Sequence, residues 1–139
     1  MTQNELSQLY WLNKETAQLQ KELLELRHRG INILPVLSDM PKGRGVSDKV
    51  SDYVAEVVIL EEIIKLNIQK IFYERNKLER YIAEIPDSEV RLIMRLRHIN
   101  GMTWDEIGAE VNQERTTVAK KYRRFINNSH NSRSKNDIV

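Results

Sequence analysis

Mostly apolar residues recur at alternating steps of three and four along the first part of the chain. The repeating positions are Leu9, Leu12, Thr16, Leu19, Leu23 and Leu26. This spacing is typical of the a and d positions of a coiled coil, and it predicts a helix from about residue 3 to residue 28. Gly30 follows the last repeat. Because glycine readily adopts the left-handed conformation in which many helices end, we expect the first helix to stop there.

A second and longer stripe of apolar residues follows with helical spacing. Its members are Val50, Tyr53, Val57, Leu60, Ile64, Ile68, Ile71, Leu78 and Ile82. The stripe predicts a helix over about residues 48–84, separated from the first helix by a loop at residues 29–47. Two helices joined in this way fold back on each other. Residues 1–85 are therefore expected to form a long antiparallel helical hairpin that resembles a coiled coil.

The second helix is apolar on more than one face. Residues outside its main stripe are Val58, Ile59, Ile63 and Leu66. The first helix alone cannot cover them, so we expect the hairpin to form a homo-oligomer, with a dimer favoured. The alternative is that these side chains rest against another part of the same chain.

Pro86 and Asp87 mark the start of a second unit, because proline disfavours helix in the residue before it and aspartate caps helices well. The following pattern predicts three short helices, over about residues 88–100, 104–111 and 115–127. Residues 86–127 are thus expected to form a three-helix domain. The polar tail, residues 128–139, is expected to be disordered. The predicted fold class is all-α.

Three signals place the start of the middle helix at Thr103. Gly101 suits the end of the preceding helix, Thr103 and Glu106 match a capping box, and Met102 and Ile107 match a hydrophobic staple. The helix ends near Asn112, a residue that tolerates the left-handed conformation of a tight turn. Two helices joined by so short a turn form a helix-turn-helix, and Gly108 leaves room for their close crossing.

The last predicted helix has one apolar and one cationic face. Placing Val118 at the centre of the buried face brings Tyr122, Phe125 and Ile126 to the same side. The opposite side carries cations and hydroxyl groups, which suit base edges and phosphates of duplex DNA. The base-edge candidates are Arg115, Thr116, Thr117 and Lys120, and the phosphate candidates are Lys121, Arg123 and Arg124.

The distribution of charge supports a polyanionic partner, although the net charge of the 139 residues is only +2. Residues 1–86 carry 12 Lys and Arg against 13 Asp and Glu, whereas residues 112–135 carry seven basic residues and one acidic residue. A basic block of this kind favours DNA through counterion release. Cysteine is absent, and no apolar stretch has the length of a membrane span. We therefore expect a cytoplasmic protein, associated with the nucleoid and not with a membrane.

The segment SDMPKGRGVSDKV, residues 38–50, is the one stretch that suggests a phosphate-binding loop. It lacks both the preceding strand and the G-x-x-x-x-G-K-[ST] spacing of such loops. The three histidines have no metal-binding spacing, and Trp11 and Trp104 are interpreted as packing residues. The sequence therefore predicts a connecting loop, no enzymatic activity, no cofactor and no metal site.

Residues 87–126, DSEVRLIMRLRHINGMTWDEIGAEVNQERTTVAKKYRRFI, resemble the region 4 helix-turn-helix of sigma-70-type RNA polymerase factors. Over its whole length the chain is similar to phage transcriptional regulators of the RinA/ArpU type. Asn112 and Glu114 depart from the pattern, which usually has glycine in the turn and Ser, Thr or Asp as the cap. The resemblance implies a regulator that binds promoter DNA, activates phage late genes and possesses a surface for host RNA polymerase. No segment equivalent to sigma region 2 is found.

Two other functions remain open. Small terminase subunits of phages also combine a helix-turn-helix with a helical oligomerisation element, so a DNA-packaging subunit is one alternative. A coiled-coil adaptor that acts without DNA is the other.

Overall fold

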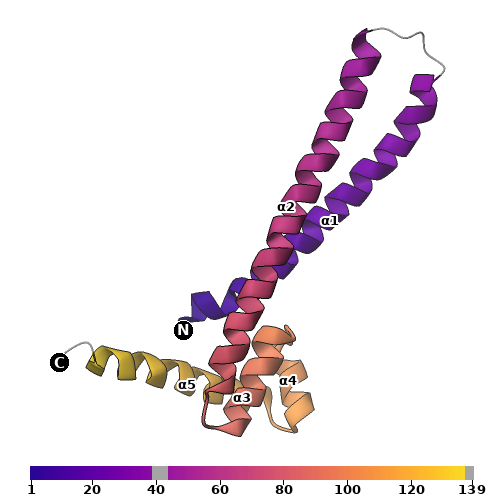
Figure 1. Ribbon diagram of the computed structural model, residues 1–139. Helices are drawn as coiled ribbons and strands as arrows, with labels where there is room; N and C mark the ends of the chain where they lie inside the picture. Colours follow the sequence, from indigo (N-terminus) through magenta and orange to yellow (C-terminus); the bar gives the residue numbers. More distant parts are fainter. Residues whose placement is uncertain (39–43, 137–139) are drawn as a thin grey trace. The chain divides into compact units, whose positions relative to one another are not determined.

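The computed structural model describes residues 1–38 and 44–136, and all of the regular structure in these ranges is helical. The long helices are α1 (Gln3–Ser38) and α2 (Arg44–Ala83). They are followed by α3 (Ser88–Met94), the π-helical segment η1 (Arg95–Ile99), α4 (Trp104–Val111) and α5 (Arg115–Asn136), as Figure 1 shows. The expected all-α class is confirmed.

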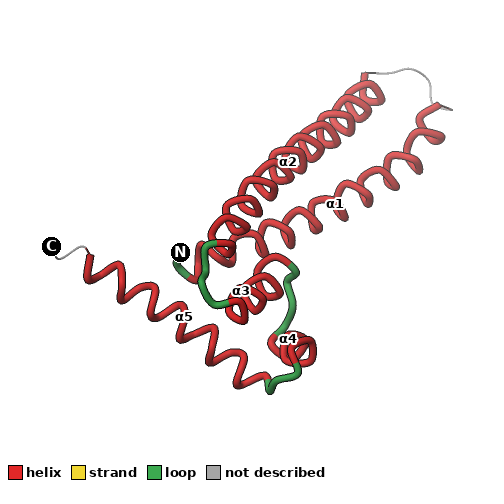
Figure 2. Tube along the Cα trace, turned by 60° about the horizontal axis from the view of Figure 1, so that its bottom comes forward, coloured by secondary structure: helices red, strands yellow, loops and turns green. Residues whose placement is uncertain are grey.

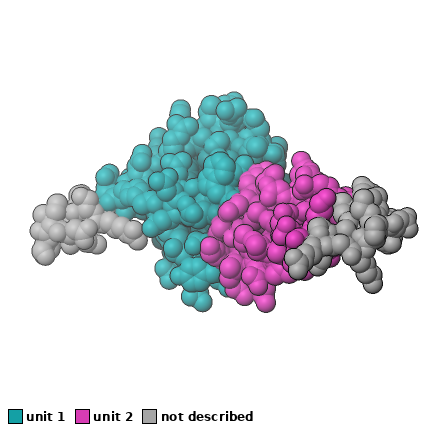
Figure 3. Space-filling view, turned by 90° about the horizontal axis from the view of Figure 1, so that it is seen from above, with its two compact units in different colours: residues 1–11, 72–139 teal, residues 12–71 magenta. Residues whose placement is uncertain are grey.

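The chain divides into two compact units, coloured separately in Figure 3. Unit 1 comprises Met1–Trp11 and Phe72–Val139, and unit 2 comprises Leu12–Ile71. The boundary expected at residue 86 thus falls inside unit 1. The reason is that the ends of α1 and α2 contribute buried side chains to the same core as the short helices. The fully buried large side chains of unit 1 are Leu6, Leu9, Leu78, Ile82, Ile93, Met94, Ile107 and Val118.

Short loops, green in Figure 2, separate α2, α3, α4 and α5, and polar side chains cap α3 and α4. Asp87 Oδ1 accepts a hydrogen bond of 2.8 Å from the Glu89 amide at the start of α3. Thr103 Oγ1 accepts one of 3.3 Å from the Glu106 amide at the start of α4, and donates one of 3.0 Å to the Glu106 carboxylate. Both expected caps are confirmed, and they stabilise amides that the helix itself leaves unbonded.

In unit 2, the two helical segments run antiparallel (Figure 1). Leu23 and Leu26 of α1 and Ile64 of α2 are buried, and Arg27 forms an ion pair of 2.5 Å with Glu61.

Gly30 does not end the first helix, because α1 continues to Ser38. A Cβ atom at residue 30 would overlap the ring of Tyr53, so glycine here lets the ring approach the backbone of α1. The predicted end of the helix at residue 28 is therefore wrong. Gly30 instead permits a close contact between α1 and α2, because it has no side chain. Of the loop expected at residues 29–47, residues 29–38 and 44–47 are helical instead. α2 begins at Arg44, and residues 39–43 lie outside the described chain.

The tail expected to be disordered is helical as far as Asn136. No glycine or proline follows Gly108 in the sequence, so no strong helix breaker interrupts this stretch, although Asn and Ser are less favourable in a helix than Ala or Leu. Ser129 Oγ donates a hydrogen bond of 2.8 Å to the carbonyl of Ile126, which holds its hydroxyl within the helix. Residues 137–139 lie outside the described chain.

Candidate nucleic-acid interface

The turn between α4 and α5 fixes the direction in which α5 leaves α4. Asn112 adopts the left-handed conformation, with φ 56° and ψ 44°, and the Gln113 amide donates a hydrogen bond of 2.9 Å to the carbonyl of Gly108. A Cβ atom at Gly108 would lie 2.7 Å from the Gln113 carbonyl oxygen, closer than side chains normally approach a backbone. The expected roles of Asn112 and Gly108 are thus confirmed.

The inner face of α5 packs against the rest of unit 1. Its buried residues are Val118, Ala119, Tyr122 and Ile126. Phe125 is half-buried, with its ring centroid 6.5 Å from that of Tyr81. The buried face predicted from the sequence is therefore correct, with Ala119 in addition.

The outer face of α5 contains six of the seven residues that the sequence singled out. Exposed are Arg115, Thr116, Thr117, Lys120, Arg123 and Arg124. Lys120, Arg123 and Arg124 form no ion pair with any residue that the structure describes. Arg115 lies 3.5 Å from Asp105, but both side chains are largely exposed, so this pair contributes little stability. The outer face thus presents uncompensated positive charge to solvent.

Lys121 differs from the other candidates because its ammonium group is engaged within unit 1. It forms an ion pair with Glu89 of α3 and donates a hydrogen bond of 3.0 Å to Gln113 Oε1. The bond from Lys121 is the largest cause of the lowered pKa of Glu89, and a bond from Gln113 adds to it. Lys121, assigned to a phosphate from the sequence, is placed where it links α5 to α3.

A buried polar contact between η1 and α5 was not identified from the sequence. His98 Nε2 lies 3.0 Å from the Tyr122 hydroxyl, and burial is the main cause that lowers the pKa of His98 from 6.5 to about 4. The charge of Arg97 lowers the pKa further, while a hydrogen bond to the backbone of Leu6 raises it. The imidazole is therefore neutral at pH 7. No spacing rule connects two residues that lie 24 positions apart.

The tryptophans are not both packing residues as expected. The ring centroid of Trp104 lies 4.9 Å from that of Tyr122, and the guanidinium of Arg97 lies over the Trp104 ring. Trp11, by contrast, is 61% exposed. The exposure of Trp11 agrees with the apolar spacing of α1, because Trp11 lies between the repeat positions Leu9 and Leu12 and not on the stripe itself.

Within the described residues, no group of three or more His, Asp or Glu side chains is arranged to bind a metal ion. None of the described helices is both long enough and apolar enough to cross a membrane.

Comparison with protein-family profiles identifies a family for this chain. The profile of DUF1492, described as a protein of unknown function, matches residues 35–131. No curated protein and no solved structure matches significantly. Because the matched segment covers more than half of the chain and includes α2 to α4 and most of α5, this protein belongs to the DUF1492 family.

Proposed function

We propose that the chain is a sequence-specific DNA-binding transcriptional regulator that inserts the outer face of α5 into the major groove of duplex DNA. The observation that carries this proposal is the composition of that face. α5 contains seven Lys and Arg residues and no Asp or Glu, and its exposed cations lie along one side. A cationic helix of this kind suits the width and the charge of the major groove.

The proposed roles of the α5 residues follow from their positions along the helix. Arg115, Thr116 and Thr117 occupy the first turn, where a recognition helix commonly contacts base edges, and Lys120 follows one turn later. Arg123 and Arg124 lie further along the helix and suit phosphates. Lys121 contributes to the interface through the bond that ties α5 to α3 rather than through a free charge.

The resemblance to sigma region 4 and to phage regulators agrees with this proposal. It supports promoter DNA as the target, activation of phage late genes as the role, and host RNA polymerase as a second partner. The proposed site of action is the bacterial nucleoid.

The experiment that tests DNA binding begins with selection of duplexes from a randomised library, followed by anisotropy titrations of the enriched duplex between 50 and 200 mM KCl. Lys120→Ala and Arg124→Ala, combined, should weaken binding and reduce the slope of log K against log salt by about one for each phosphate that is no longer neutralised. Lys65→Ala, which removes an exposed cation of unit 2, is the matched control. Absence of any enriched sequence, or an unchanged affinity and slope, contradicts the proposal.

The second part of the proposal is a homodimer formed through α2. Val58, Ile59, Ile63 and Leu66 all lie in unit 2 with between 38% and 56% of each side chain exposed. Ile59, Ile63 and Leu66 follow steps of four and three, which is the spacing of a coiled-coil seam. A dimer covers this seam and presents two copies of α5, as a regulator of a palindromic operator requires.

The dimer is tested by sedimentation equilibrium at tens of micromolar. Ile63→Glu with Leu66→Glu should give a monomer, whereas Leu24→Glu, which also replaces an exposed leucine in unit 2, should leave the dimer intact. A wild-type monomer refutes the dimer. A ring of eight or more subunits refutes it too, and favours a DNA-packaging subunit.

A further inference from the structure

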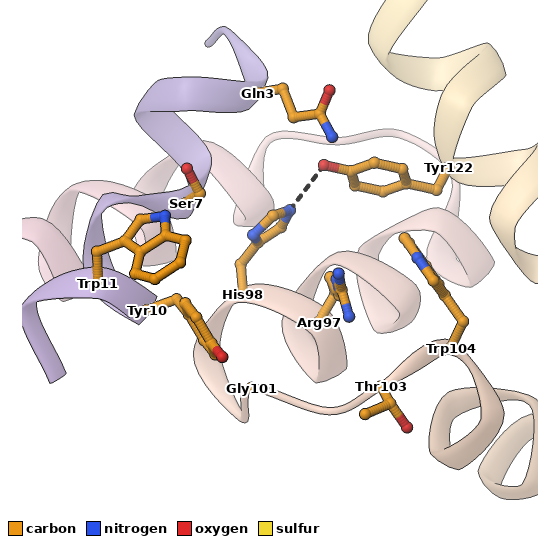
Figure 4. A pocket seen from close by; sticks show the side chains of 10 residues that line it. All are labelled: Gln3, Ser7, Tyr10, Trp11, Arg97, His98, Gly101, Thr103, Trp104 and Tyr122. Carbon is orange, nitrogen blue, oxygen red and sulfur yellow. Dashed lines mark hydrogen bonds between the residues drawn. The ribbon is translucent and has the colours of Figure 1, made fainter. Parts of the chain in front are cut away.

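Unit 1 contains a cavity of about 360 Å³ that the DNA-binding face of α5 does not use. Its lining includes Tyr10, Trp11, Arg97, His98, Trp104 and Tyr122. Figure 4 shows Tyr10 and Trp11 of α1 on one side, Trp104 on the other, and the His98 and Arg97 side chains between them. A volume of this size is at the lower end of the range found for small-molecule sites.

The backbone beneath the cavity is irregular. Arg97 and His98 belong to η1, in which the amide of Asn100 donates a hydrogen bond of 3.1 Å to the carbonyl of Arg95, five residues earlier. Two successive side chains of this segment line the cavity. π-helical segments are rare and occur frequently at functional sites.

The charge of the cavity is positive. Among the described residues that line it, Arg97 is the one Lys, Arg, Asp or Glu side chain. Its guanidinium donates a hydrogen bond of 2.9 Å to the carbonyl of Met102 and lies 4.5 Å from the ring centroid of Trp104, but no described carboxylate forms an ion pair with it. A guanidinium that has unused donors and no acidic partner attracts an anionic group, above all a carboxylate or phosphate.

Aromatic rings supply the other recognition surface. The side chains of Tyr10 and Trp11 are 42% and 61% exposed, and their rings meet edge to face with centroids 5.1 Å apart. Large exposed aromatic side chains that gather at a concave site commonly contact a ligand. The Gln3 amide, which also lines the cavity, adds a hydrogen-bonding group near its edge.

We propose that this cavity binds a small planar aromatic anion, whose ring stacks against Trp11 and whose negative group pairs with Arg97. The proposal does not depend on DNA binding, since none of the exposed candidate residues of α5 lines the cavity.

The tryptophans give a direct test, because the chain contains only two and both line the cavity. In ¹⁵N-labelled full-length protein, the two indole N–H signals report on the site. Three probes are compared. Benzoate has both an aromatic ring and a negative charge, benzamide has the aromatic ring without the charge, and cyclohexanecarboxylate has the charge without an aromatic ring. Benzoate should shift both indole signals saturably, and the other two probes should bind at least fivefold more weakly.

Three variants complete the test. Arg97→Gln should weaken benzoate at least fivefold and leave benzamide within twofold, whereas Arg124→Gln on the outer face of α5 should change neither. Trp11→Ala removes an exposed ring, so the fold should persist, and it should weaken both aromatic probes at least threefold as judged from Trp104. Should Arg97→Gln fail to fold, Trp11→Ala decides the question. Indole signals that do not move, equal affinity for all three probes, or full affinity in Trp11→Ala overturns the proposal.

Discussion

Large apolar side chains are buried more deeply in unit 1 than in unit 2. Within the described residues, all eight large side chains with less than 2% exposure lie in unit 1. The buried aliphatic residues of unit 2, Leu23, Leu26 and Ile64, retain 5% to 9% exposure. Six large apolar residues in the described part of its α2 segment lie open to solvent: Val54, Val58, Ile59, Ile63, Leu66 and Ile68. Two helices bury one stripe each, whereas helices that pack from several directions can enclose a side chain.

Polar groups show the same difference. In unit 1, Asp87 and Thr103 bond helix ends, and His98 bonds Tyr122. In unit 2, the buried atoms Thr16 Oγ1 and Asn67 Nδ2 have no hydrogen-bond partner among the described residues. The buried polar groups of unit 1 named here are therefore hydrogen-bonded, whereas unit 2 contains two buried polar atoms without a partner among the described residues.

The largest expected difference between the units concerns matched leucines. Leu78→Ala empties a fully buried position of unit 1 and should lower the free energy of unfolding by about 3 kcal/mol. Leu66→Ala, at an exposed position of unit 2, should cost less than about 0.5 kcal/mol in the monomer. Urea unfolding at submicromolar protein, followed by far-ultraviolet circular dichroism, measures both, since the described regular structure of both units is helical. Equal losses would contradict the difference in burial between Leu78 and Leu66.

The stability of unit 1 should also fall in mild acid, because of His98. Its pKa is about 4 in the folded chain and 6.5 in the unfolded chain, so the unfolded state binds more protons between these values. The contribution of neutral His98 is complete above pH 6.5 and is lost as the pH falls towards 4. From pH 7 to pH 5 the loss should be about 2 kcal/mol.

The same urea titrations at pH 7, 6 and 5 measure this loss, and His98→Gln, which cannot titrate, should remove most of it. Lys121 lowers the pKa of Glu89, and Arg95 lowers that of Glu79. The stability that these two carboxylates contribute is therefore lost only as the pH falls below their usual pKa of 4.5. Between pH 6.5 and pH 5, the loss of stability is therefore expected to come from His98 and not from these carboxylates. A flat profile in that window would show that the imidazole is not held neutral by burial.

Much of the local structure of unit 1 could be predicted from the sequence because each signal acts over a few residues. Thr103 caps the helix that follows it, Asn112 adopts the left-handed conformation, and Gly108 contacts a residue five positions later. The two faces of α5 follow from helical periodicity alone. Such features depend on neighbours that the sequence itself specifies.

The features that could not be predicted depend on residues far apart in the chain. Gly30 faces Tyr53, and Lys121 pairs with Glu89 across 32 positions. A glycine that permits close packing has the same sequence signature as one that ends a helix. A lysine that holds two helices together likewise looks the same as one that binds phosphate, and only the tertiary arrangement separates these roles.

The smallest expected effect concerns the two unbonded polar atoms of unit 2. Replacing Thr16 by Val and Asn67 by Leu keeps their approximate size and removes buried groups that lack partners among the described residues, so the double variant should gain about 1 kcal/mol. Hydrogen exchange of the amides in residues 12–71 measures the gain locally. Thr117→Val, the same change at an exposed position of α5, is the control and should leave exchange in unit 2 unchanged. Faster exchange in the double variant would show that Thr16 and Asn67 stabilise the paired helices through bonds of their own, and that the polar groups of unit 2 are as well satisfied as those of unit 1.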